Sequence, residues 1–219
     1  MAQRISSMQE SVYANQAIAK LMSIPNGSFC CEKVVCSEMG SRLFLAMSAV
    51  NPNAVAKCLR FILREKDTEW IKNNIKDGVR RNIVYTLNKL CFAQESYDDA
   101  IIVLAKLADA ENEHWANNSI NEFRQLFHVY LAGTEVDLSR RLKTIKELKD
   151  NGYVLLASDA LDSAFKNLHF NRMCGAEKFG WRHREEYHPQ TKEIIEYWDG
   201  CLELLISWYD RSEVSISRI

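Results

Sequence analysis

The chain has 219 residues, of which 47% are hydrophobic and 26% charged, and its formal net charge is −1. This composition is that of a soluble globular protein with a sizeable core, so it excludes wholesale disorder. A net charge near zero also excludes a global field that would recruit nucleic acid or an anionic membrane. Glycine (eight) and proline (three) are scarce, which favours helices over a many-turned β protein.

Apolar residues recur at helical spacing in a succession of segments that turn residues separate. In chain order, the predicted helices span residues 6–22, 32–50, 53–65, 68–75, 79–91, 96–109, 119–131, 137–149, 153–168 and 190–209. Pro52 ends the second, because proline cannot continue the helical hydrogen-bond ladder. The helix at 32–50 carries Met39 and Leu43 on its apolar face, and the last helix is expected to bury Ile194, Ile195 and Leu202. No strand is predicted.

Residues 112–142 are predicted to form one complete helical hairpin. Ser119 and Glu122 have the spacing of a capping box, in which each side chain bonds the backbone N–H of the other residue. Gly133 suits the end of that helix, because glycine adopts the left-handed conformation without a Cβ clash. Thr134 and Asp137 have the spacing of a second capping box. The residues predicted to be buried where the two helices meet are Phe123, Leu126, Phe127 and Leu142.

The spacing of the predicted hairpins indicates a repeat. The second helices of successive hairpins begin near residues 53, 96 and 137, in steps of roughly 40 residues, as in HEAT or armadillo repeats. We therefore expect an all-α fold, a right-handed α-solenoid of about four helical hairpins, with residues 1–219 forming a single repeat domain. An irregular helical bundle is the alternative.

Cysteine usage and the absence of targeting signals predict a cytoplasmic protein. Four of the seven cysteines (Cys36, Cys58, Cys91 and Cys201) fall on predicted apolar helix faces, where a free thiol behaves as a small hydrophobic group. The N-terminal segment lacks the apolar core of a signal peptide. No run approaches the roughly 20 apolar residues of a membrane span, so no membrane association is expected.

The histidines and cysteines do not complete a metal site. His183 and His188 are five residues apart, which places them on different sides of a helix, whereas a helical zinc pair needs a spacing of four. The thiols of Cys30, Cys31 and Cys36 have no second cluster to complete four ligands. We expect a solvated loop, inert thiols, and neither metal nor cofactor.

No residue set compels a chemistry, and a non-catalytic role is favoured. The sequence has no phosphate-binding glycine-rich loop and no nucleophile elbow. The stretch between residues 93 and 113 contains one basic residue, Lys106, and six acidic residues. The acidic residues are Glu95, Asp98, Asp99, Asp109, Glu111 and Glu113. A pair of them could do acid–base work in a helical cleft, which would make the protein a hydrolase, but a solvated acidic face is the commoner meaning of such a run.

The strongest binding candidate lies within a predicted loop at residues 169–189. Cations and aromatic rings alternate there, and the candidate binding residues are Arg172, Lys178, Trp181, Arg182 and Arg184. Cations beside stackable rings suit phosphate and base contacts. The favoured alternative is that the rings anchor the loop while the cations stay in solvent. The basic loop and the acidic stretch at 93–113 could also dock like chains head to tail.

A family resemblance supports an architectural role. The segments Trp115-Ala-Asn117-Asn118, Leu126-Phe127, Gly133-Thr134 and Arg141-Leu142 resemble helical-repeat regions of large bacterial proteins, which often follow a STAND-type NTPase or another effector domain, some in antiphage defence. The segments at 175–180 and 189–197 fit the same pattern. The resemblance implies a fold and no catalytic residue. The chain lacks an NTPase domain, so it is either part of a longer protein or works alone.

Together these observations predict a non-catalytic binding, sensor or scaffold module whose partner is a protein or a fused effector domain. Self-association is left open. The first alternative is a nucleic-acid-binding or repair protein built on HEAT-like repeats, which the net charge disfavours. The second is the hydrolase with carboxylates in a helical cleft.

Overall fold

The computed structural model describes residues 2–166, 176–180 and 182–209. In this part the chain forms eleven helices and one two-stranded hairpin, so the prediction of a mostly helical protein is confirmed. The helices are α1 (Ala2–Leu21), α2 (Glu32–Val35), α3 (Glu38–Ser48), α4 (Pro52–Leu63), α5 (Thr68–Asn74), α6 (Asp77–Phe92), α7 (Tyr97–Asp109), α8 (Ser119–Gln125), α9 (Leu138–Asp150), α10 (Val154–Phe165) and α11 (Thr191–Tyr209).

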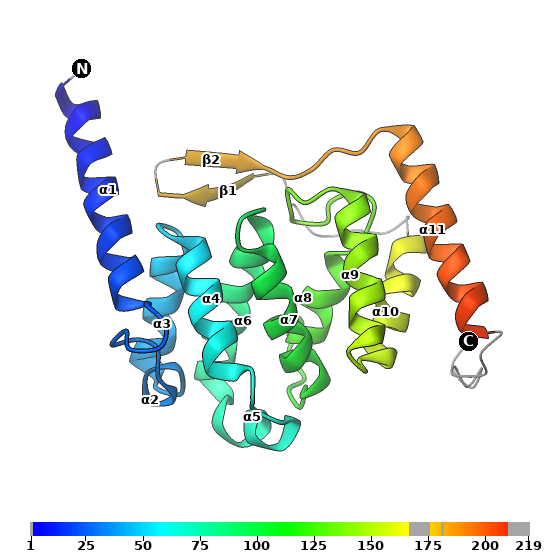
Figure 1. Ribbon diagram of the computed structural model, residues 1–219, viewed down its shortest axis with the longest axis horizontal. Coiled ribbons are helices and arrows are strands. Elements are labelled where there is room, and N and C mark those ends of the chain that lie inside the picture. The colour runs from blue at the N-terminus through cyan, green and yellow to red at the C-terminus, as the bar shows by residue number, and fades with distance from the viewer. Residues whose placement is uncertain (1, 167–175, 181, 210–219) are drawn as a thin grey trace.

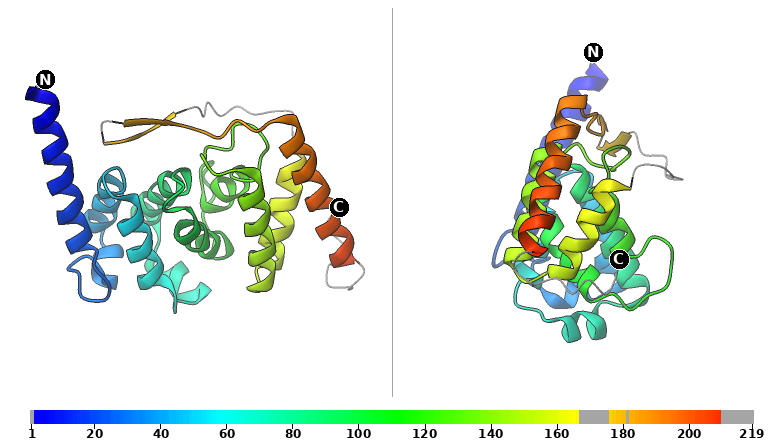
Figure 2. Two further views of the ribbon diagram at one scale, coloured as in Figure 1. Left: turned by 45° about the horizontal axis from the view of Figure 1, so that its top comes forward. Right: turned by 90° about the vertical axis from the view of Figure 1, so that its right-hand side faces the viewer.

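The helices stand beside one another in chain order, from α1 at one end of the molecule to α11 at the other (Figure 1). Packing follows the same order: α3 lies against α4 and α6, α7 against α4, α6 and α8, and α10 against α8, α9 and α11. Seen from the α11 end, the molecule is much narrower (Figure 2). One hydrophobic core runs through the row and includes residues of every long helix.

Amphipathic spacing explains the helices that the sequence located well. Val55, Leu59 and Ile62 recur at intervals of four and three on α4, and all three are buried. The side chain of Asn51 accepts a hydrogen bond from the Ala54 N–H, which satisfies a free donor at the start of the helix. The predicted starts at 53, 96 and 137 fall within one residue of the observed starts of α4, α7 and α9.

The predicted capping box at Ser119 is wrong. Asn118 is the N-cap of α8, and its Oδ1 accepts from the Asn121 N–H at 3.1 Å. The N–H and hydroxyl of Ser119 both donate to Glu111. Glu122 accepts instead from the Asn88 amide. Asparagine is as good an N-cap as serine. Ser119 donates instead to Glu111 in the preceding loop, so Asn118 caps the helix.

The second predicted capping box is wrong in the same way. Asp137 caps α9, with its Oδ1 accepting from the Arg140 N–H at 2.9 Å. Thr134 is buried, and its hydroxyl donates to the carbonyl of Cys91 at 2.7 Å. Thr134 therefore ties the loop before α9 to the end of α6 and starts no helix.

The segment at 112–142 is not a hairpin of two paired helices. Helix α8 ends at Gln125 and not at Leu131, and Leu131 adopts the left-handed region with φ 52°. Helix α8 packs against α6, α7 and α10, whereas α9 packs against α10 and α11. Phe123, Leu126 and Phe127 are buried as predicted, but Leu142 is only half-buried.

Leu142 lies instead against α11. A Cβ atom at Gly200 would come within 2.3 Å of a Leu142 methyl carbon. A larger residue at position 200 would therefore displace the Leu142 side chain or move α11 away from α9.

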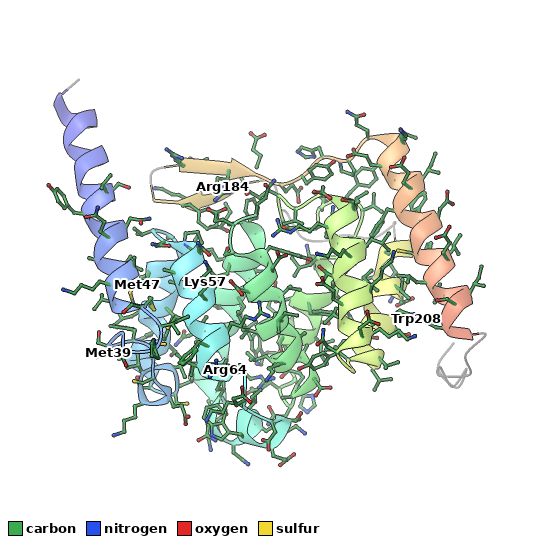
Figure 3. All side chains as sticks on the ribbon, viewed as in Figure 1. Met39, Met47, Lys57, Arg64, Arg184 and Trp208 are labelled. Atoms are coloured by element: carbon green, nitrogen blue, oxygen red, sulfur yellow. The ribbon has the colours of Figure 1, made fainter. Side chains whose placement is uncertain are left out.

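Several apolar side chains lie on the solvent side of their helices, contrary to prediction. The segment predicted as one helix at 32–50 is broken into α2 and α3, with Ser37 capping α3. Met39 is 77% exposed at the outer end of the row (Figure 3), and Leu43 is also exposed. On α11, Tyr197 and Cys201 occupy the buried face beside Ile194, whereas Ile195 and Leu202 are exposed. Helices α3 and α11 carry apolar residues on more than one side, so the spacing of apolar residues alone does not predict which side is buried.

The predicted loop at 169–189 contains a β-hairpin, so the expectation of no strand is wrong. Strands β1 (Ala176–Phe179) and β2 (Arg182–Glu185) pair antiparallel, with Phe179 opposite Arg182. Gly180, with φ 60°, begins the turn, as two-residue hairpin connections favour. The hairpin runs back from the α11 end across one edge of the row toward α1 (Figures 1 and 2).

Candidate functional site

The two faces of the hairpin differ in burial. Opposite residues of an antiparallel pair point to the same face, so Glu177 shares a face with Arg184, and Lys178 shares the other face with His183. Phe179 lies on the same face as Arg184 and is only 7% exposed, whereas Lys178 and His183 are exposed. The face carrying Phe179 and Arg184 is therefore turned toward the helices.

Arg184 is held between two carboxylates. Its Nη1 and Nη2 donate to the two oxygens of Glu95, at 2.7 and 2.8 Å, and its Nε donates to Oε1 of Glu135 at 2.7 Å. Arg184 Nη2 also donates to Oε2 of Glu135. Such forked, charge-assisted hydrogen bonds are strong and geometrically specific. Arg184 holds the pKa of Glu95 below its usual range, against the opposing effect of burial.

An aromatic contact fixes the hairpin beside this charge cluster. The rings of Phe179 and Phe92 lie 6.1 Å apart between centroids, and Ala93 completes a small apolar cluster. The Nζ of Lys89 lies 4.8 Å from the Phe179 ring centroid and pairs with the carboxylate of Glu177. The part of the helical row that receives the hairpin is called here the hairpin-contact surface, and it consists of Lys89, Phe92, Ala93, Glu95 and Glu135.

The predicted binding residues do not share one surface. Arg184 lies between the hairpin and the helices (Figure 3) and is paired with an acid of the 93–113 stretch. Lys178 is on the opposite face of the hairpin, and Arg182 is exposed beside the turn. Arg172 and Trp181 lie outside the described residues. The local positive charge is therefore partly neutralised within the chain.

The acidic residues between positions 93 and 113 are also paired with other groups of the chain. All six carboxylates accept hydrogen bonds or form ion pairs: Glu95 with Arg184, Asp98 with Arg140, Asp99 with Arg60, Asp109 with Thr68, Glu111 with Arg80, and Glu113 with the N–H of Asp77. Three of these contacts, those of Asp98, Asp99 and Asp109, join α7 to helices that lie about 40 residues away in the chain. The acids hold neighbouring helices together, where the sequence indicated a solvated face.

A groove crosses the face formed by α4, α7 and α9. Its volume is about 360 Å³, and its lining residues are Arg60, Asp98, Ile102, Arg140, Lys143, Thr144, Glu147 and Asn151. Arg140 Nη2 lies 2.8 Å from Asp98, and Lys143 Nζ lies 3.3 Å from Glu147. Arg140 and Lys143 belong to a run of basic residues in the sequence, and nothing in that run indicates that three helices form one groove.

Neither a metal-binding cluster nor a membrane-spanning helix is found among the described residues. In the part of the chain that the structure describes, no three His, Cys, Asp or Glu side chains are placed to hold a metal ion together. His183 and His188 are both exposed. The Cys58 thiol donates to the Phe29 carbonyl at 3.8 Å, and burial raises the pKa of both Cys30 and Cys58. Among the described helices, none has the length and apolar character needed to cross a membrane.

Comparison with known proteins yields no relative: no protein-family model, curated protein or solved structure matches the chain. The resemblance to helical-repeat regions of bacterial effector proteins therefore stays a prediction.

Proposed function

We propose that this chain is a non-catalytic helical-repeat binding module, and that the groove across α4, α7 and α9 binds a segment of a protein partner. In this proposal α4, α7 and α9, which begin roughly 40 residues apart, occupy equivalent positions in successive repeats of a solenoid. The observation that carries it is that the groove takes side chains from all three of these helices. Repeat proteins bind partners on such extended surfaces, made from equivalent positions of neighbouring repeats.

The chemistry of the groove favours a peptide over a nucleic acid. Its cations Arg60, Arg140 and Lys143 are accompanied by the acids Asp98 and Glu147. Affinity for nucleic acid comes largely from cations that neutralise phosphates, and acids at the same place oppose it. A peptide that carries both charges can exchange partners with the exposed ion pair of Lys143 and Glu147, and Ile102 offers it a small apolar contact. A hydrolase is disfavoured, because the carboxylates of the 93–113 stretch are already engaged with neighbouring groups.

Reversing one charge in the groove tests this function. Lys143→Glu is expected to lower partner capture from a lysate of the source cells at least tenfold, as quantitative mass spectrometry would measure it. The matched control is Lys192→Glu on α11. Both lysines are exposed and form an i,i+4 pair with a glutamate, at 3.3 and 3.6 Å, but Lys192 lies outside the groove. Asn151→Trp, which fills the groove, is expected to reproduce the loss.

Two results would contradict the proposal. One is equal recovery of every partner by wild type, Lys143→Glu and Asn151→Trp, with circular dichroism showing all three folded. The other is oligonucleotide binding that weakens steeply as salt rises and that Lys143→Glu abolishes, which would favour the nucleic-acid alternative.

A further inference from the structure

The hairpin is attached to the row mainly by a few side chains. Phe179, Phe92 and Ala93 form an apolar cluster that is separate from the main core. The charged contacts are partly open to solvent, since the side chains of Arg184 and Glu95 are 25% and 43% exposed. Salt weakens ion pairs that solvent can reach. The contact is therefore specific in its chemistry but limited in extent.

The segment that leaves β2 adds two further attachments, one through its backbone and one through a side chain. The N–H of Tyr187 donates to the Thr134 carbonyl at 2.8 Å, and the N–H of Gly133 donates to Glu186 at 3.1 Å. These bonds lie beyond the end of β2, near the loop that precedes α9. The hairpin itself depends on Phe179 and on the two charged contacts, Arg184 with Glu95 and Glu135, and Glu177 with Lys89.

The hairpin-contact surface is complementary to one particular arrangement of side chains. Glu95 and Glu135 surround a single guanidinium, Phe92 and Ala93 receive one aromatic ring, and Lys89 receives one carboxylate. Without the hairpin, two like charges would face each other beside an uncovered aromatic ring. Any segment that binds there must supply a cation and an aromatic ring at the hairpin's spacing, and every copy of this chain carries such a segment.

We propose that two copies of this chain associate by exchanging their β1–β2 hairpins, each hairpin binding the hairpin-contact surface of the other copy. The exchanged contacts are those that the hairpin makes within one chain, so no new complementarity is needed. The closed monomer and the exchanged dimer then compete for the same surface, and protein concentration decides between them. This association uses a different surface from the groove and does not depend on the proposed function.

Charge reversal on the two sides of the contact provides a test with the full-length chain. One variant carries Arg184→Glu, so its hairpin and its own contact surface are both acidic. The other carries Glu95→Arg and Glu135→Arg, so its hairpin and its surface are both basic. Neither can close on itself, but each hairpin matches the surface of the other variant. An equimolar mixture is expected to form a 1:1 dimer, with a dimer fraction at least tenfold higher than in either variant alone, measured by analytical ultracentrifugation.

A second, independent pair guards against a variant that fails to fold. Lys89→Glu reverses the surface side of the other ion pair, and Glu177→Lys reverses its hairpin side, so their mixture is expected to behave in the same way. Lys178→Glu lies on the outward face of the hairpin and serves as the control, with no effect on association expected. Mixtures of both kinds that stay monomeric while circular dichroism shows folded protein would overturn the proposal. So would single variants that dimerise as strongly as the mixtures, because the association would then use another surface.

Discussion

Arg80→Met is expected to lower the free energy of unfolding by about 3–5 kcal/mol, the range for breaking a buried ion pair by removing one partner. The Arg80 side chain is fully buried, and that of Glu111 is only 5% exposed, with 3.1 Å between Nε and Oε1. The approach lies off the N–H direction, so the contact is an ion pair without a hydrogen bond along Nε–H. Removing the arginine leaves a carboxylate with little access to water.

The same arginine also satisfies the end of a helix. Its Nη2 donates to the carbonyls of Leu107 and Ala110, at 2.6 and 3.0 Å, and its Nη1 donates to the carbonyl of Ile75 at 3.3 Å. The last carbonyls of a helix have no partner within it, so buried ones need donors from elsewhere. Methionine fills similar space but donates nothing, so these buried carbonyls lose a partner.

Arg60→Met is the matched control, because Arg60 also pairs with a carboxylate of the 93–113 stretch, that of Asp99, but is 49% exposed. Its expected cost is below about 1 kcal/mol. Urea denaturation with an unchanged m-value would measure both. Equal losses for the two arginines would show that burial does not distinguish these ion pairs.

The loss of unfolding free energy caused by Arg80→Met is also expected to depend on pH. Burial raises the pKa of Glu111, but the Ser119 hydroxyl and Arg80 outweigh it, so the pKa lies below its usual range. A depressed folded-state pKa contributes stability that is present above the unfolded pKa and lost as pH falls through the folded pKa. The difference between wild type and Arg80→Met is therefore expected to shrink as the pH falls through that range.

The sequence predicted the helices where local signals agree. Helices α4, α7 and α9 each begin where a polar or turn residue precedes an apolar stripe, and both signals lie within one stretch of the chain. At α8, by contrast, two neighbouring side chains, Asn118 and Ser119, could each serve as the cap. The choice between Ser119 and Asn118 depends on Glu111, which reaches the serine from the preceding loop.

Buried arginines were not predictable from local charge. Arg141 follows Arg140 in a basic run that indicates a solvated helix face, yet Arg141 is fully buried. Its Nη1 donates to the carbonyls of Leu126 and His128, at 3.2 and 2.7 Å. In a helix that ran to Leu131 the Leu126 carbonyl would have bonded the Tyr130 N–H, so Arg141 satisfies a carbonyl left free by the early end of α8.

The hairpin contact was beyond sequence reasoning for a different reason. Arg184 bonds acids that are 89 and 49 residues away in the chain, so a sum of charges over one segment cannot detect that it is paired. Strands of four residues are also too short to give a clear alternation of polar and apolar positions. The segment's cations therefore suggested a binding surface, whereas one of them holds the hairpin to the helices.

Phe127→Ala is expected to lower the free energy of unfolding by about 3–5 kcal/mol, through lost transfer free energy and the cavity that remains. Phe127 is fully buried, and its ring lies 5.0 Å from that of Phe123, between centroids. Tyr130→Ala is the control three residues further on, since Tyr130 is 47% exposed and its loss is expected to change stability by about 0.5 kcal/mol or less. Leu142→Ala is expected to fall between the two, because Leu142 is half-buried. A cost for Phe127→Ala below about 1 kcal/mol in urea denaturation would mean that the site collapses around the alanine and leaves no cavity.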